Sequence, residues 1–175
     1  IMMFPFSIIL GFGNGFQPVA GFNWGAKRYD RVRESYRFSS KMAFLGSLIM
    51  AGLVLVFAEP IIVLFAGTDP EMQKIGAFAM RTQAIALPIH AWVAIVNMMC
   101  AGLGNAKGAV ALSTARQGSC FIPILYPMAW IFGAWGVASV QAVADVLTLV
   151  LAVPIMLHVM KQINQAEKAL AQQAQ

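Results

Sequence analysis

One acidic residue stands in the middle of a long apolar stretch of this sequence, where a carboxylate could exchange protons or bind a cation. Asp145 shares a helix face with Gln141 and Thr148, which lie at i−4 and i+3. A carboxylate in such surroundings is costly unless it is paired or functional, so we predict that Asp145 and Gln141 line an ion or substrate pathway. The alternative is that Asp145 pairs with a base or with donors on neighbouring helices and only fixes the packing.

His90 and Asn97 form a second candidate group, because seven residues bring them back to one helix face. An imidazole titrates near neutral pH and could relay protons. The alternative is a neutral histidine that is satisfied by hydrogen bonds. Together the two side chains could line one wall of a cavity.

Asn14 and Gln17 are the third candidates, and both are amides in an otherwise apolar segment. Pro18 removes one backbone hydrogen bond and should open the helix near Asn14. The alternative is plain helix packing, with the amides bonded between helices. Because an amide or a charge facing lipid would be left unpaired, we expect all six candidates to face the inside of the bundle or its cavity: Asn14, Gln17, His90, Asn97, Gln141 and Asp145.

Other chemistry is not supported by the sequence. It contains no phosphate-binding Gly-rich loop, no H-E-x-x-H, no C-x-x-C and no cooperating Ser/His/Asp set. Cys100 and Cys120 have no metal-ligand spacing and are expected to be buried apolar residues. We therefore predict no enzyme activity, no catalytic residues, no metal site and no cofactor.

The composition indicates a membrane protein, with 59% hydrophobic and 11% charged residues. A helix needs about 20 residues to cross the bilayer, and the long apolar runs lack the alternation of β-barrel strands. We predict an all-α membrane protein, a polytopic helical bundle of about five transmembrane helices. The expected spans are 1–24, 42–66, 84–103, 117–132 and 137–160, with a turn at Gly133–Gly136 dividing the last two. The fourth helix should be lengthened by residues 108–115, with the Arg116 side chain reaching out to the membrane interface.

The basic residues are distributed unevenly between the predicted connections. Ten lie in residues 25–41, in residues 104–116 and after Met160, against two in residues 67–81. By the positive-inside rule the three segments that carry the ten basic residues, including the C-terminus, are cytoplasmic. We predict that residues 25–41 form an amphipathic surface helix in contact with anionic lipid and not with nucleic acid. Residues 161–175 should continue the last helix as a cytoplasmic tail, and an outside start with five spans fits a piece of a longer protein.

Several motifs together resemble the multidrug and toxic compound extrusion (MATE) family. Gln17-Pro18, Gly21, Asn23 and Gly25-Ala26 stand in the register of its signature, followed by K-R-x-D-R-V. Further matches cover nearly the whole chain in the order of the family: Arg81 before Leu87-Pro88, Gly102 to Lys107, Arg116-Gln117 with Pro123, and Gly136-Val137-Ala138 with Asp145.

This resemblance implies the last five helices of a twelve-helix transporter, in the C-terminal half, with the first helix of that lobe absent. It implies export of lipophilic, often cationic drugs by alternating access, driven by H⁺ or Na⁺ as coupling ion. The partners would be the missing N-terminal half, membrane lipid and drug substrates, in a prokaryotic plasma membrane. The third span lacks the acid that some members carry, which argues against an ion site in this half. The alternatives are a lipid-linked saccharide flippase of the same superfamily and a truncated membrane module without transport.

Overall fold

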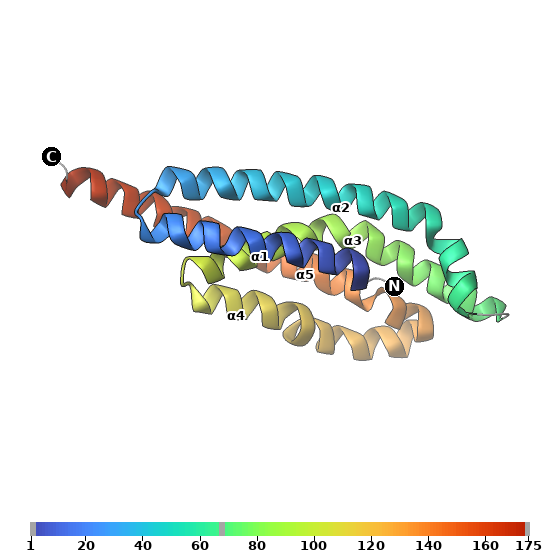
Figure 1. Cartoon of the computed structure of the whole chain (residues 1–175). Helices are drawn as coiled ribbons and strands as arrows, with labels where there is room; N and C mark the ends of the chain where they lie inside the picture. The colour runs from blue at the N-terminus through green and yellow to red at the C-terminus, as the bar shows by residue number, and fades with distance from the viewer. Residues whose placement is uncertain (1–2, 67–68, 174–175) are drawn as a thin grey trace.

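The computed structural model describes residues 3–66 and 69–173, and every element in these ranges is a helix. In chain order the elements are α1 (Met3–Gly25), α2 (Tyr29–Ala66), α3 (Pro70–Gly102), α4 (Ala106–Thr114), the π-helix η1 (Ala115–Ser119) and α5 (Phe121–Gln173). They run alongside one another in an elongated bundle (Figure 1). The all-α prediction is confirmed.

Helix α3 forms the centre of the bundle, because it contacts α1, α2, α4 and α5. Its second half, from Ala84 to Cys100, contains small alanines among Val, Ile, Leu and Met, and most of these residues are buried. Small side chains allow neighbouring helices to approach closely on several sides. The outward faces of α2 and α5 are rich in exposed large apolar residues, which is the arrangement expected in lipid.

Three helical stretches in the described residues are long and apolar enough to cross a membrane: Tyr29–Phe65, Pro70–Gly102 and Ala106–Gln172. The third stretch passes along the bundle twice, because α5 reverses direction at Gly133, where φ is 56° and ψ is −135°. Only glycine adopts this conformation without strain. The turn lies where the Gly133–Gly136 sequence predicts it. Helix α1 is not among the three stretches, so the division into five spans stays a prediction.

The basic segment after α1 differs from the prediction. Residues 29–41 are not a separate surface helix but the first turns of α2, which is continuous from Tyr29. No proline or glycine interrupts residues 29–41, and Arg31 pairs with Glu34 at 2.9 Å along the helix. Val32 and Tyr36 are buried in the core of the bundle, which ties this segment to it.

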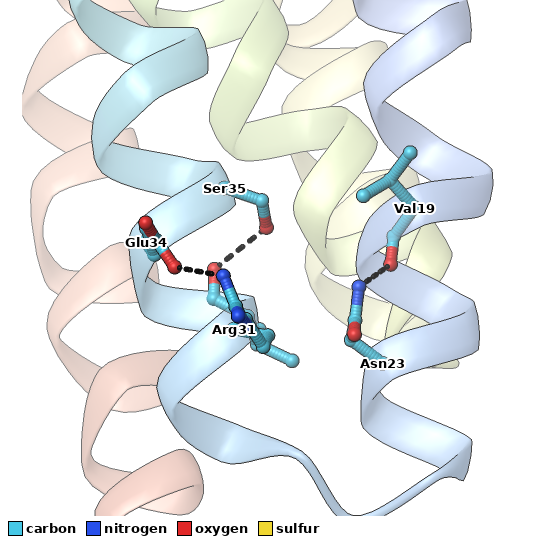
Figure 2. Close-up of polar contacts among 6 residues, drawn as sticks. Val19, Asn23, Arg31, Glu34 and Ser35 are labelled. Carbon is cyan, nitrogen blue, oxygen red and sulfur yellow. Dashed lines mark hydrogen bonds and ion pairs between the residues drawn. The ribbon is translucent and has the colours of Figure 1, made fainter.

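Figure 2 shows the connection between α1 and α2, with Arg31, Glu34 and Ser35 on one side and Asn23 on the other. The Asn23 amide donates to the Val19 carbonyl oxygen over 2.8 Å and so stays on its own helix. Lys27 turns the chain with a φ of 57°.

The last helix continues beyond the predicted fifth span, as expected for the tail, and is helical to Gln173. Its extension contacts the basic part of α2, because Glu167 forms an ion pair with Arg33 and Ile163 is fully buried. The α1–α2 turn, the α3–α4 turn and the end of α5 lie at one end of the bundle, and the reversal at Gly133 lies at the other (Figure 1).

Candidate functional site

A buried ion pair joins the π-helix to the second limb of α5. Arg116 Nε donates to Asp145 Oδ1 over 2.8 Å, and the two side chains are only 18% and 4% exposed. Gln141 Nε2 donates to the same oxygen over 3.4 Å. Single-turn π-helices are frequent at functional sites, and here η1 presents Arg116 to the carboxylate.

The position of Arg116 overturns the expectation that its side chain reaches out to the membrane interface. An arginine in an apolar bundle gains more from a carboxylate than from a long path to water, and Asp145 needs a cation for the same reason. The predicted grouping of Asp145 with Gln141 is present, whereas the Thr148 hydroxyl donates to the Ala144 carbonyl of its own helix. The pairing matches the alternative in which a base holds Asp145.

An aromatic residue of α1 connects this pair to His90. The Phe6 ring meets the His90 ring edge to face, with centroids 4.8 Å apart, and the Arg116 guanidinium carbon lies 5.0 Å from the centre of the same ring. A cation near an aromatic ring is attracted by the ring quadrupole. Three helical elements, α1, α3 and η1, therefore meet at Phe6.

A cavity of about 310 Å³ opens beside this contact and is lined by His90, Asn97 and Arg116. Asn97 Nδ2 donates to Ser113 Oγ over 3.0 Å, which links α3 to α4. Both ring nitrogens of His90 and Oδ1 of Asn97 are buried without a hydrogen-bond partner among the described residues. His90 and Asn97 thus line one cavity, whereas their place on an ion or substrate pathway stays a prediction.

Asn14 and Gln17 lie apart from this group. Asn14 is exposed and Gln17 is half-buried, so neither is enclosed by the described helices, and their place on a cavity stays a prediction. The buried face of α1 includes Gly13 and Phe16, which directly precede Asn14 and Gln17 in the sequence. Helix α1 is continuous through Pro18, and no opening near Asn14 is seen.

Arg116 and Phe6 are members of the site that were not predicted from the sequence. Arg116 could have been predicted, because a carboxylate such as Asp145 inside an apolar bundle requires a basic partner. Arg116 directly precedes the uncharged residues 117–144 that lead to Asp145. Phe6 carried no signal, since one of twelve phenylalanines is not distinguished by its type. Within residues 3–66 and 69–173 no cluster of three His, Cys, Asp or Glu side chains could hold a metal ion.

Long apolar helices packed around a buried ion pair and a cavity with polar side chains in its wall define a polytopic helical membrane protein. The sequence profile of the MatE family matches residues 1–127. The chain therefore belongs to the MatE family.

Individual relatives agree with this assignment. Multidrug export protein MepA of Staphylococcus haemolyticus (strain JCSC1435) is 24% identical over 152 residues, which are 87% of this chain and 33% of MepA. The fold resembles the Vibrio cholerae MATE transporter VcmN in the bent form, with a TM-score of 0.82 and 20% identity over 93% of this chain and 37% of VcmN. An inward-facing multidrug resistance MATE family transporter of the MOP superfamily gives a TM-score of 0.84 at 17% identity, over 93% of this chain and 38% of that one. The chain thus spans between 33% and 38% of the length of each of these relatives.

Proposed function

We propose that this chain is the greater part of the C-terminal lobe of a multidrug exporter, which moves lipophilic, often cationic compounds outward in exchange for H⁺ or Na⁺. Membership of the MatE family and the name of MepA support the transport class and the drug substrates. The partial coverage of the relatives supports a partner half that supplies the rest of the transporter.

The observation that carries a transport role for this lobe is the buried polar group around Asp145. Arg116, Asp145 and Gln141 lie inside an apolar bundle next to a cavity, where ionisable groups are costly and mark ion pathways. Asn14 and Gln17, on the less buried side of α1, are proposed to face the substrate path formed with the other lobe. Alternating access would then rock the two lobes about that path.

The protein is proposed to lie in a prokaryotic plasma membrane, with the C-terminus in the cytoplasm. The α1–α2 turn, the α3–α4 turn and the end of α5 share one end of the bundle, and they carry most of the basic residues (Figure 1). That clustering supports one sidedness by the positive-inside rule.

Drug efflux by the full-length gene product in cells without other exporters tests the proposal. Wild-type protein should lower dye accumulation when an H⁺ or Na⁺ gradient is imposed, and Asp145→Asn and Gln17→Ala should each reduce that efflux at normal membrane levels. Glu59→Gln, a carboxylate exposed near the end of α2, is the matched control and should retain efflux. Accumulation unaffected by the wild-type protein under either gradient would contradict the proposed function.

A further inference from the structure

Arg116 donates a hydrogen bond to Asp145, while other buried acceptors on residues that line the same cavity have no donor. Its Nε bonds Asp145 Oδ1 over 2.8 Å, and its side chain also lines the cavity of about 310 Å³. His90 and Asn97 line the same cavity, and Asn97 Oδ1 and both ring nitrogens of His90 are buried without a partner among the described residues. His90 is 96% buried, since only 4% of its surface is exposed.

Unpartnered buried acceptors destabilise a bundle unless a donor reaches them in some state. A neutral imidazole offers one acceptor nitrogen and the Asn97 amide offers one oxygen. Arg116 lines the same cavity, and its guanidinium carries five N–H groups, of which the Nε group donates to Asp145. A contact through one nitrogen holds the guanidinium less firmly than a two-point fork does.

The Phe6 ring contacts both groups that the exchange would bring together. The centroids of the Phe6 and His90 rings lie 4.8 Å apart, and the Arg116 guanidinium carbon lies 5.0 Å from the Phe6 ring centroid. A cation can move across an aromatic ring while it keeps part of its electrostatic stabilisation. Between Asp145 and the cavity wall, Arg116 would therefore not cross a purely apolar region.

We propose that Asp145 is a cation site for which Arg116 is the internal competitor. When a proton or a small monovalent cation occupies the carboxylate, the guanidinium leaves Asp145, enters the cavity and donates to Asn97 Oδ1 and His90. When the cation leaves, Arg116 returns to Asp145. This inference rests on the proposed function, because it assigns the coupling ion of that exporter to a residue pair.

The charged and titratable groups around Asp145 fit this exchange. Arg116 faces it from η1, His90 lies on α3 against the same Phe6 ring, and α1 contains no charged residue in Met3–Gly25. One cation replaces another on Asp145, so the carboxylate is compensated in both states. The displaced arginine is stabilised by Phe6 and by the two acceptors. The same movement would shift a contact of η1 from α5 to α3, which links cation binding to helix packing.

Removal of the competitor tests the proposal directly in the full-length protein. Arg116→Gln should lower the half-saturating concentration of the coupling cation about tenfold, if Arg116 occupies Asp145 roughly nine-tenths of the time. Two readouts are used: drug efflux, and the change of tryptophan fluorescence of the purified protein during titration. Titration of Na⁺ at fixed pH and of pH at fixed Na⁺ distinguishes the two cations. Arg81→Gln removes the arginine of another interhelical pair, with Glu59 at 2.8 Å, and should leave the value unchanged.

A second variant keeps the test valid if Arg116→Gln does not fold. Asn97→Ala removes one acceptor for the displaced guanidinium and should raise the half-saturating concentration about threefold or more, because the cation-bound state becomes less favourable. Ser113→Ala breaks the same Asn97–Ser113 hydrogen bond but leaves Asn97 Oδ1 in place, so it should have no effect on that value.

The results separate this inference from the proposed function. A wild-type protein that exports drug, with half-saturating concentrations unchanged in both Arg116→Gln and Asn97→Ala, would overturn the competitor role and leave the exporter standing. Opposite shifts of the fluorescence titration in a protein without drug efflux would support the exchange at Asp145 and contradict the exporter.

Discussion

Arg116 Nε donates to Asp145 Oδ1 over 2.8 Å and so joins two helical segments whose residues are 29 positions apart. The pair is nearly excluded from solvent, with side-chain exposures of 18% and 4%. Neither charge has an alternative ion partner within the part of the chain that the structure describes. Loss of either partner therefore leaves the other as an isolated charge in an apolar bundle.

Asp145→Ala should lower the free energy of unfolding by about 3–5 kcal/mol, because it leaves the Arg116 guanidinium buried and uncompensated. Thermal unfolding of the purified full-length protein in detergent measures the loss. Glu59→Ala breaks the exposed pair with Arg81 and should cost only about 0–1 kcal/mol.

The double substitution Arg116→Met with Asp145→Leu separates two contributions to the free energy of unfolding: that of the ion pair itself, and that of leaving one buried charge without a partner. Apolar replacement of both partners should restore most of the stability lost in Asp145→Ala, since no charge remains to be desolvated. A double variant no more stable than Asp145→Ala would show that the site depends on packing around Asp145 and not on its charge.

Gly133→Ala should destabilise the reversal of α5 by about 1–3 kcal/mol, because a φ of 56° with a ψ of −135° is strained for any residue with a Cβ. Gly52→Ala is the control: Gly52 lies inside α2 with nothing within 4 Å of its missing Cβ, so alanine should stabilise by about 0.5–1 kcal/mol. Thermal unfolding of the two variants should move in opposite directions. A Gly133→Ala protein as stable as wild type would be incompatible with the described turn.

Gly102→Ala should separate α1 from α3, since its Cβ would lie 2.7 Å from the Gln17 carbonyl oxygen. The clash is with backbone on a rigid helix, and no side-chain rotation relieves it. Disulfide cross-linking between cysteines placed at Gln17 and Leu103 should slow in this variant. Gly15→Ala adds a methyl group where nothing lies within 4 Å, and cross-linking should proceed at the wild-type rate.

Much of the fold was predictable because it depends on local composition. Long uncharged runs predict helices, and the Gly133-Ala134-Trp135-Gly136 sequence predicts the turn at Gly133. The extension of α2 back to Tyr29 was not predicted, because charge alone suggested a surface helix. What decides its course is the burial of Val32 and Tyr36 in the shared core and the ion pair of Arg33 with Glu167, 134 residues away.

The candidate site was predictable only within single helices. Spacing placed His90 with Asn97 and Gln141 with Asp145, since residues three, four or seven apart share a helix face. The contact of Arg116 with Asp145 and of Phe6 with His90 depends on which helices are neighbours, and periodicity carries no such information. The π-helix that presents Arg116 is likewise a product of packing and not of a recognisable motif.

The sidedness of the bundle gives the last prediction. Glu34 and Glu71 are both exposed and lie near the starts of α2 and α3, which are at opposite ends of the bundle (Figure 1). Replacement of either should cost little, since Glu34 makes only a surface ion pair with Arg31 and the contact of Glu71 with Asp69 uses its backbone N–H. If basic residues stay on the cytoplasmic side, a membrane-impermeant thiol reagent added to intact cells should label Glu71→Cys and spare Glu34→Cys. Both cysteines should react after permeabilisation, which controls for burial. If only Glu34→Cys were labelled in intact cells, the orientation would be the reverse of the predicted one, with the end of the C-terminal helix outside the cell.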